Sequence, residues 1–255
     1  MSHSTGFAGF ASATTDFADA VAVLAPIVAY PALVLVLEAL PTGTLAPLRA
    51  TRMPYNLAQS LYAACVVGLV LAKLLRHDRL ASVHALVCVA SPGTPIGYYA
   101  SKWIEMYDGV LVVAAGKSPN GLQVRHHSLA PALVAMHTAG RAMPSPLYDL
   151  SVLANGVVHT VMYLYFAFPR ALAPLRRTVT SLQIAQFLLV AAAIVLALGW
   201  PVADADATNA SSACDAPQTA LGVSLLIYTL FVVDFLKFYM SAYPPTAALA
   251  RVKGE

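Results

Sequence analysis

The stretch VTSLQIAQFLLVAAAIVLALGW, residues 179–200, contains no charged side chain. An apolar run of about 20 residues is long enough to cross the hydrocarbon core of a bilayer as an α-helix. The other apolar runs lie near residues 20–40, 57–75, 95–115, 126–140, 147–168 and 219–241. The sequence therefore predicts an all-α integral membrane protein, a bundle of seven transmembrane helices that forms a single membrane domain over residues 1–255.

The composition of the chain agrees with burial in a membrane. Of its 255 residues, 59% are hydrophobic and 11% are charged, whereas a soluble domain carries about 25% charged residues. The net charge is only +3, and the basic residues are scattered between apolar segments, which argues against nucleic-acid binding. Residues 1–16 lack the basic start and the strongly apolar stretch of a cleavable signal peptide.

Two features break the regular pattern of long apolar runs. The apolar stretch 81–90 is too short to cross a bilayer and is followed by a Pro- and Gly-rich sequence, so it is expected to be interfacial or re-entrant. The three cysteines, Cys65, Cys88 and Cys214, have no CxxC spacing and an odd count. Neither a disulfide framework nor a zinc site is therefore indicated, and Cys65 and Cys88 are expected to be apolar packing residues.

The orientation in the membrane follows from the loop cations. Across seven spans, one side collects most of the Lys and Arg residues, which the positive-inside rule assigns to the cytosol. This places the N-terminus in the lumen and the C-terminus in the cytosol. The predicted lumenal loop 201–218 has no Lys or Arg and contains a sequon, so Asn209 is expected to be available for glycosylation. Arg251 and Lys253 resemble a dibasic retrieval signal of the endoplasmic reticulum.

Charged and amide side chains recur at regular intervals in the predicted third and sixth helices. Lys102, Glu105 and Asp108 are three residues apart, so they share one broad helical face. Two interpretations stay open for them: a buried charge network that pins the helix, or a catalytic or substrate-binding role. Gln183 and Gln186 repeat at the same interval, and taken alone they predict interhelical hydrogen bonds.

Histidines are the strongest candidates for chemistry. His126 and His127 are adjacent, while Asn155, His159 and Tyr163 are four residues apart and line one face of the predicted fifth helix. Titratable groups at membrane depth are costly to bury and are functional candidates by default. Imidazole can transfer protons or attack as a nucleophile near neutral pH. The pattern predicts a membrane enzyme with a histidine-based site; the alternative is a set of hydrogen-bonded core residues.

Four sequence blocks stand in order between residues 102 and 187. They are KWIEMYD at 102–108, QVRHH at 123–127, NGVVHTVMYLYF at 155–166 and TSLQIAQF at 180–187. Together they resemble the KxxExxD, HxxHH, NxxVHxxMYxYY and TxxQxxQF segments of the ELO family of fatty-acid elongases. Gln123 stands where most of the family has a histidine, and Gly109 replaces a usual threonine. Elongases with glutamine at this position are known in the family, many of them linked to polyunsaturated chains.

The resemblance implies an acyltransferase that condenses a long-chain acyl-CoA, polyunsaturated chains included, with malonyl-CoA to give 3-oxoacyl-CoA, CoA and CO2. It implies that His126 accepts the acyl group, with His127 and His159 left for orientation, proton handling or enolate stabilisation. Lys102 or Lys117 is expected to contact the CoA phosphates. The residues expected to bind or orient substrates are Lys102, Glu105, Asp108, Gln123, Asn155, Tyr163, Gln183 and Gln186.

Further expectations concern the surroundings of the site. The bundle is expected to enclose an acyl tunnel in the endoplasmic reticulum membrane, among membrane lipids. No cofactor or metal is expected beyond the acyl-CoA and malonyl-CoA substrates. The reductases and dehydratase of the elongation cycle are the expected protein partners, and a homodimer is left open.

Two other classes of protein compete with the elongase interpretation. Membrane di-iron oxygenases also use histidine boxes, but a two-iron site needs about eight ligands. The chain has seven histidines, with His3 in the tail and His77 in a predicted loop. The other alternative is a non-catalytic, elongase-like transporter or scaffold whose polar residues line a pathway.

Overall fold

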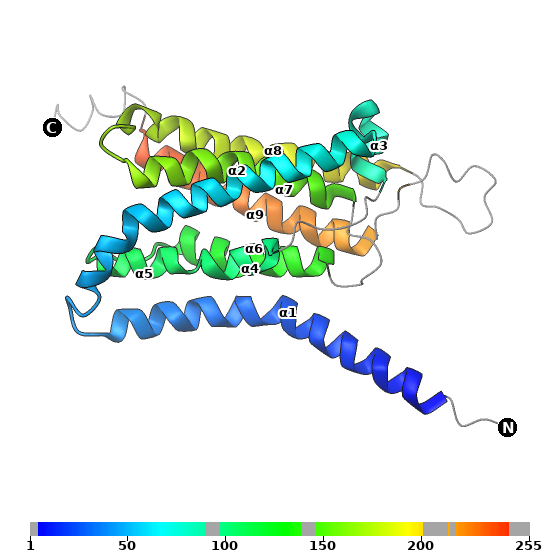
Figure 1. Ribbon diagram of the computed structural model, residues 1–255, viewed down its shortest axis with the longest axis horizontal. Coiled ribbons are helices and arrows are strands. Elements are labelled where there is room, and N and C mark those ends of the chain that lie inside the picture. Colours follow the sequence, from blue (N-terminus) through cyan, green and yellow to red (C-terminus); the bar gives the residue numbers. More distant parts are fainter. Residues whose placement is uncertain (1–4, 90–96, 139–145, 201–213, 215–217, 245–255) are drawn as a thin grey trace.

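The computed structural model describes residues 5–89, 97–138, 146–200, 214 and 218–244. Every regular element in these ranges is a helix (Figure 1). Five of the helices are long and apolar enough to cross a bilayer, which makes the chain a multi-pass membrane protein. They are α1 (Thr5–Ala39), α2 (Arg52–Arg76), α7 (Pro146–Ala167), α8 (Arg176–Gly199) and α9 (Gln218–Ala242). Short 3-10 helices occupy Ala46–Thr51, Arg79–Ala81 and Ala173–Leu175.

The remaining two predicted spans differ from expectation. The segment predicted as one helix near 95–115 forms two short helices, α4 (Tyr98–Ile104) and α5 (Tyr107–Ala114). The fourth predicted span is α6 (Gly121–Thr138), which begins before the histidine pair rather than at it. Neither α4 nor α5 is long enough to cross a bilayer alone, and α6 is not among the five apolar helices. The count of seven spans therefore stays a prediction.

The shorter helices lie inside the bundle. In Figure 1, α4, α5 and α6 run between α1 on one side and the group of α2, α7, α8 and α9 on the other. Helix α1 packs along α6, α2 along α7, and α8 along α9. Gly156 permits the close approach of α2 to α7, since a Cβ atom there would lie 2.8 Å from the Val67 side chain. Helices α4, α5 and α6 thus lie between α1 and the group of four other long helices, one of which, α7, carries His159.

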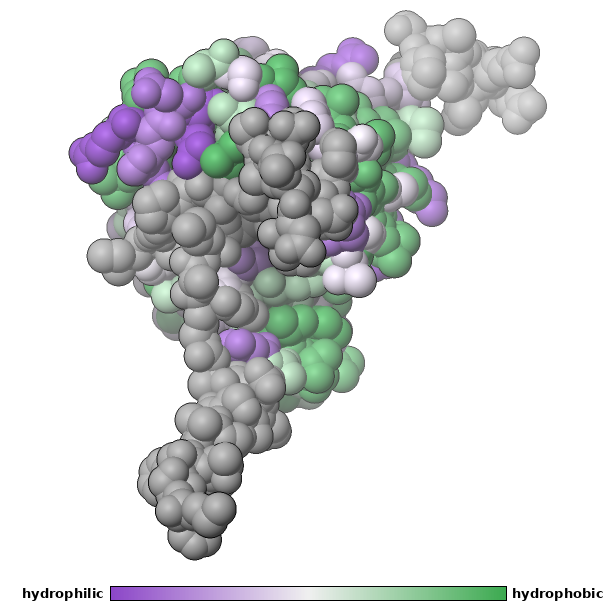
Figure 2. Space-filling view, turned by 90° about the vertical axis from the view of Figure 1, so that its right-hand side faces the viewer, coloured by the Kyte–Doolittle hydropathy of each residue, from purple (hydrophilic) through white to green (hydrophobic). Residues whose placement is uncertain are grey.

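Helix α8 illustrates how the sequence divides between core and surroundings. One face is buried and includes Phe187, Val190, Ile194 and Ala197, at the spacing of a helical stripe. Its other faces are equally apolar, with Leu188, Leu189, Val195 and Leu196 exposed. A helix that is hydrophobic all round belongs in a membrane or a large core. Figure 2 shows hydrophobic residues gathered over one side of the molecule, as expected of a surface that faces lipid.

The cysteines correct the sequence prediction. Cys88 and Cys214 form a disulfide across 126 residues of sequence, so the prediction that no disulfide is present was wrong. Cys88 ends α3 (Val83–Cys88), the short helix within the stretch predicted to be interfacial or re-entrant. Both sulfurs belong to a buried apolar cluster, so the packing role of Cys88 holds as well. Cys65 is free and exposed on α2, which contradicts its predicted packing role.

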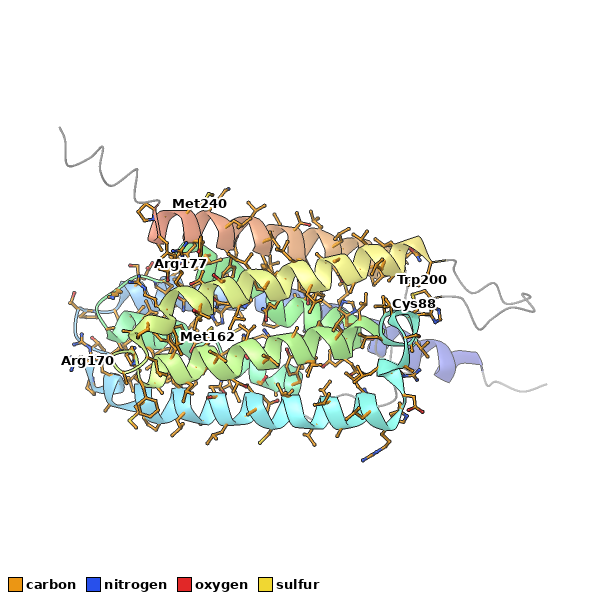
Figure 3. All side chains as sticks on the ribbon, turned by 90° about the horizontal axis from the view of Figure 1, so that it is seen from above. Cys88, Met162, Arg170, Arg177, Trp200 and Met240 are labelled. Carbon is orange, nitrogen blue, oxygen red and sulfur yellow. A yellow bond between two sulfur atoms is a disulfide. The ribbon has the colours of Figure 1, made fainter. Side chains whose placement is uncertain are left out.

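The bundle has two chemically different ends. Figure 3 shows Cys88 and Trp200 at one end and Arg170 and Arg177 at the other. The end with Cys88 and Trp200 is the disulfide end, and the end with Arg170 and Arg177 is the basic end. The predicted glycosylation site Asn209 and the dibasic pair Arg251 and Lys253 lie outside the described residues.

Candidate active site

Helix α6 places its histidines one turn into the bundle. The Asn120 side chain accepts a hydrogen bond of 2.8 Å from the Gln123 backbone N–H, which caps the start of the helix. Adjacent residues on a helix point about 100° apart, so His126 and His127 face different neighbours. The His126 ring lies among the rings of Phe187, Phe231 and Phe235, with centroids 5.9, 4.9 and 6.0 Å away. His126 is therefore partly buried and flanked by three aromatic rings.

His127 faces the other side of α6. Its Nε2 atom lies 3.8 Å from Oδ2 of Asp108, and its ring packs on Tyr30 of α1 with centroids 5.1 Å apart. Gly109 follows Asp108 directly and stands where the family that the sequence resembles usually has a threonine. A Cβ atom at Gly109 would lie 2.6 Å from the Tyr30 hydroxyl. The glycine thus makes room for the tyrosine that packs against His127.

The predicted charged row and the predicted Asn–His–Tyr line meet residue by residue. The Lys102 ammonium donates to Asn155 Oδ1 at 2.8 Å, and His159 Nδ1 lies 3.4 Å from Glu105 Oε1. Asp108 continues the series, accepting a hydrogen bond of 2.9 Å from the hydroxyl of Tyr163. Each member of the charged row, spaced three residues apart, thus faces the corresponding member of the Asn–His–Tyr line, spaced four residues apart.

Glu105 is the hub of this network. Its Oε1 atom lies 2.6 Å from the Lys102 ammonium, and both side chains are buried. The carboxylate thus contacts both a fixed cation and the imidazole of His159. A buried ion pair is tolerated only where its charges are matched and hydrogen-bonded, which Lys102 and Glu105 satisfy through each other, Asn155 and His159. The two interpretations of this row are compatible, since one network both pins the helices and orients His159.

The three glutamines of the prediction border one cavity, but their surroundings differ. Gln123, Gln183 and Gln186 all line the larger cavity described below. Gln183 donates to the sulfur of Met162 at 3.1 Å, an interhelical contact between α8 and α7. The Oε1 atom of Gln186 is buried and has no hydrogen-bond partner among the described residues.

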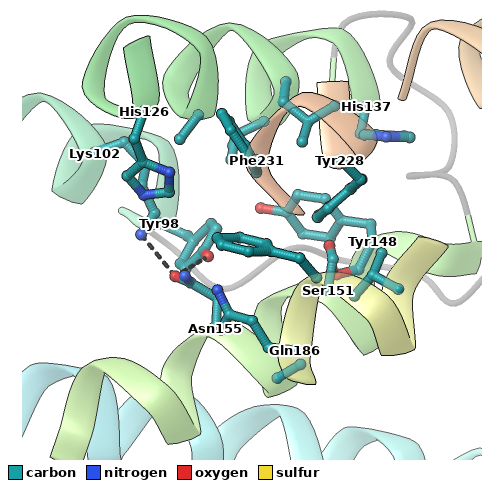
Figure 4. Close-up of a pocket in the computed structure, with 16 residues that line it drawn as sticks. Tyr98, Lys102, His126, His137, Tyr148, Ser151, Asn155, Gln186, Tyr228 and Phe231 are labelled. Carbon is teal, nitrogen blue, oxygen red and sulfur yellow. Dashed lines mark hydrogen bonds between the residues drawn. The ribbon is translucent and has the colours of Figure 1, made fainter. Parts of the chain in front are cut away.

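Two cavities meet at His126. The outer cavity has a volume of about 490 Å³ and opens toward the basic end, where Arg52, Lys117 and Arg176 line it; its walls also include His126, His127 and His159. The inner cavity has a volume of about 40 Å³ and contains His126 and His137 in its wall. Figure 4 shows these two histidines at opposite ends of the inner cavity. His126 therefore stands between a wide, partly charged chamber and a narrow inner one, whereas His127 lines only the wide chamber.

Tyr98 is a site residue that the spacing analysis missed. Its hydroxyl donates to Asn155 Oδ1 at 2.8 Å, and the Lys102 ammonium lies 4.7 Å from its ring centroid. Tyr98 precedes Lys102 by four residues, so extending the charged face by one helical turn would have found it. Among the described residues, no group of three or more His, Cys, Asp or Glu side chains is arranged to hold a metal ion.

These features define a class of protein: a multi-pass membrane protein with a histidine and carboxylate cluster enclosed by its helices. The chain belongs to the GNS1/SUR4 (ELO) family, whose family model matches residues 17–250.

Individual relatives agree with this assignment. The chain is 26% identical over 220 residues to fatty acid elongase 1 of Trypanosoma brucei brucei, covering 80% of this chain and 70% of the relative. It is 27% identical over 156 residues to fatty acid elongase A of Dictyostelium discoideum, covering 60% of this chain and 55% of the relative. It is 31% identical over 99 residues to very long chain fatty acid elongase 6 of Drosophila melanogaster, covering 36% and 29%. No solved structure gives a significant match.

Proposed function

We propose that the protein is a fatty-acid elongase that condenses a long-chain acyl-CoA with malonyl-CoA to give 3-oxoacyl-CoA, CoA and CO2. Family membership and the names of the relatives support the reaction class. The observation that carries the proposal is the position of His126, flanked by aromatic rings where the two cavities meet. A nucleophile at this junction can receive a substrate from one chamber and hold its product in the other.

The first half-reaction is acyl transfer to His126. An imidazole nitrogen attacks the thioester carbonyl, the C–S bond breaks, and the CoA thiolate leaves with a proton. The acyl-imidazole is more reactive than the thioester it replaces, so water must be kept away from it. The rings of Phe187, Phe231 and Phe235 shield the His126 imidazole on their side, and bound CoA substrate would close the side that faces the outer cavity.

The second half-reaction uses malonyl-CoA in the outer cavity. Loss of CO2 leaves the electron pair on the α-carbon as an enolate, which attacks the acyl carbon and expels the His126 imidazole. Donors placed near the developing negative charge would stabilise the enolate. His159 is suited to this role because Glu105 holds its Nδ1 side, leaving the other ring nitrogen for the substrate. His127, held near Asp108 and Tyr30, would orient the pair.

The CoA moiety is assigned to the outer cavity and the acyl chain to the inner one. Lys102 is buried and paired with Glu105, so the geometry favours Lys117 for phosphate contact. Arg52 and Arg176 join Lys117 in lining the outer cavity. An acyl chain needs more room than the inner cavity offers at rest, so Phe187 and Phe231 must move when it enters.

Replacing any of the three outer cations, Arg52, Lys117 or Arg176, by glutamine is expected to raise the KM for acyl-CoA about tenfold with a small effect on kcat. A charge-assisted contact to phosphate is worth roughly 1.5 kcal/mol or more. Steady-state kinetics at low and high salt measure the effect, which should shrink as salt rises. Arg76→Gln, at the opposite end of α2, is the matched control. An unchanged KM in all three variants contradicts the assignment of the outer cavity.

The proposed location is the endoplasmic reticulum membrane, with the basic end in the cytosol. Clustered Lys and Arg residues favour the cytosolic side, and a disulfide forms in an oxidising compartment such as the lumen. Cys88 and Cys214 lie at the end opposite to Arg170 and Arg177. This orientation opens the outer cavity to cytosolic CoA thioesters. The reductases and dehydratase of the elongation cycle would then work at the same face.

The function is tested in membranes that contain the protein, with radiolabelled malonyl-CoA and a panel of acyl-CoAs. We expect label in 3-oxoacyl products two carbons longer than the acceptor, and the panel gives the chain length and unsaturation preference. Matched membranes without the protein are the control. Absence of product with every acceptor rejects the proposal and favours the elongase-like transporter or scaffold, whose acyl-CoA movement can be followed in the same vesicles.

A further inference from the structure

The far end of the inner cavity is polar, although an ordinary acyl chain ends in a methyl group. His137, Tyr148, Ser151 and Tyr228 line this end, beyond the aromatic rings around His126. The Nδ1 atom of His137 is buried and has no hydrogen-bond partner among the described residues. Buried polar atoms are normally satisfied by protein, water or ligand. Among the described residues, the cavity therefore offers no hydrogen-bond partner to this nitrogen.

The hydrogen bonds of His137 fix which kind of partner is missing. Its Nε2 atom lies 2.8 Å from Oγ of Ser224 on α9. The single hydroxyl hydrogen of Ser224 is donated to the Ala220 carbonyl at 2.7 Å, so Ser224 accepts from His137 and Nε2 carries the hydrogen. A neutral imidazole with hydrogen on Nε2 has a bare acceptor at Nδ1. The missing partner must be a hydrogen-bond donor.

The distance from His126 fixes where along an acyl chain that donor would lie. His126 and His137 are both on α6, about three helical turns apart and so on one face, and separated by roughly 16 Å along the axis. An extended carbon chain advances roughly 1.3 Å per carbon, given bonds near 1.5 Å. A chain attached at His126 would thus reach His137 at roughly its twelfth to fourteenth carbon.

We propose that the inner cavity binds acyl chains that carry a hydroxyl group about a dozen carbons from the thioester, and that His137 Nδ1 accepts the hydrogen bond of this hydroxyl. The hydroxyl can donate to His137 and accept from a lining hydroxyl such as that of Tyr148 or Tyr228. The proposal rests on the proposed function, because it needs the chain to enter the inner cavity from His126. It makes hydroxylated long-chain acyl-CoAs a preferred substrate class.

The test compares saturated 18-carbon acyl-CoAs with no hydroxyl, with a hydroxyl near the twelfth carbon, and with a hydroxyl near the sixth. In the wild type we expect kcat/KM for the first isomer to exceed that of the unsubstituted chain about fivefold, the value of a typical net hydrogen bond. The second isomer should react more slowly than the unsubstituted chain, because its hydroxyl lies against aromatic rings. In His137→Leu the preference for the first isomer should be lost or reversed.

Thr138→Val is the matched control. The Thr138 hydroxyl donates a hydrogen bond within its own helix, and Thr138 does not line the inner cavity. The substitution therefore removes a polar group next to His137 without changing the cavity wall. The wild-type ratio of kcat/KM for the hydroxylated chain to kcat/KM for the unsubstituted chain should persist in this variant. Because each ratio is measured within one variant, losses of folding or of overall activity cancel. A wild-type ratio near one, or a ratio that survives in His137→Leu, overturns the proposal and leaves the cavity to water alone.

A binding measurement separates this proposal from the elongase function. The melting temperature of purified protein in detergent is measured with free 12-hydroxystearate (a hydroxyl at about the proposed carbon) and with stearate. Selective stabilisation by the hydroxy acid, in the wild type but not in His137→Leu, supports the site even if no acyl-CoA is elongated. Elongation of unsubstituted chains with equal stabilisation by both acids rejects the hydroxyl site while the elongase function stands.

Discussion

Replacing His126 by alanine is expected to lower the rate of elongation at least about a thousandfold, because removal of a covalent nucleophile leaves only binding and positioning effects. The wild type incubated with acyl-CoA alone should release free CoA and retain a hydroxylamine-labile acyl group at His126. Both signals should be absent in His126→Ala. The measurements are product formation from radiolabelled malonyl-CoA, thiol release, and mass mapping of the acylated peptide.

A histidine outside the site provides the control. His84, in α3 near Trp200 at the disulfide end, is far along the bundle from the outer cavity, so His84→Ala should keep both CoA release and acylation. The assignment of His126 is wrong if His126→Ala elongates at close to the wild-type rate. It is also wrong if CoA release from the wild type requires malonyl-CoA, because the acyl-enzyme would then not precede condensation.

Breaking the Lys102–Glu105 pair should have the largest effect on stability. Lys102→Met leaves Glu105 buried without its cation, and loss of one partner from a buried pair costs about 3–5 kcal/mol. The salt bridge is 2.6 Å long and both side chains are almost fully buried. The melting temperature of purified protein in detergent should fall sharply. Replacing both residues, as in Lys102→Met with Glu105→Leu, should cost less than the sum of the single changes.

An exposed ion pair is the comparison. Arg125 makes two hydrogen bonds to Asp234, at 2.6 and 2.8 Å, but its side chain is largely exposed. Arg125→Gln should therefore cost at most about 1 kcal/mol. A Lys102→Met protein as stable as Arg125→Gln would mean that the charge of Glu105 is compensated elsewhere, and the network described for His159 would need revision.

Residue spacing predicted the two polar faces of the site, because the pattern is local and regular, but it did not predict that these faces pair with each other. Lys102, Glu105 and Asp108 at intervals of three, and the Asn–His–Tyr line at intervals of four, each define one helical face. Polar faces at membrane depth are costly to expose to lipid, so both are expected to point into the bundle. The pairing of Asn155 with Lys102 and of Tyr163 with Asp108 is known only from the structure.

Features that depend on tertiary contacts could not be predicted in the same way. The break between α4 and α5 falls at Glu105 and Met106, where the sequence has no proline or glycine from which a break could be predicted. The Cys88–Cys214 disulfide joins segments 126 residues apart and needs the fold to bring them together. The bare nitrogen of His137 follows from a hydrogen bond to Ser224 on another helix. In each case the deciding partner lies far away in sequence.

The Cys88–Cys214 bond turns the intervening chain into a covalent ring. Helices α4 to α8, with the histidine pair of α6 and the Asn–His–Tyr line of α7, lie within the ring, whereas α1, α2 and α9 extend from it as two arms. A single peptide-bond cut anywhere in the ring leaves both halves of the cluster joined through sulfur, while a cut in an arm leaves the part of the arm beyond the cut without a covalent link. Because Cys214 precedes α9, the ring can close only after all five enclosed helices have been synthesised.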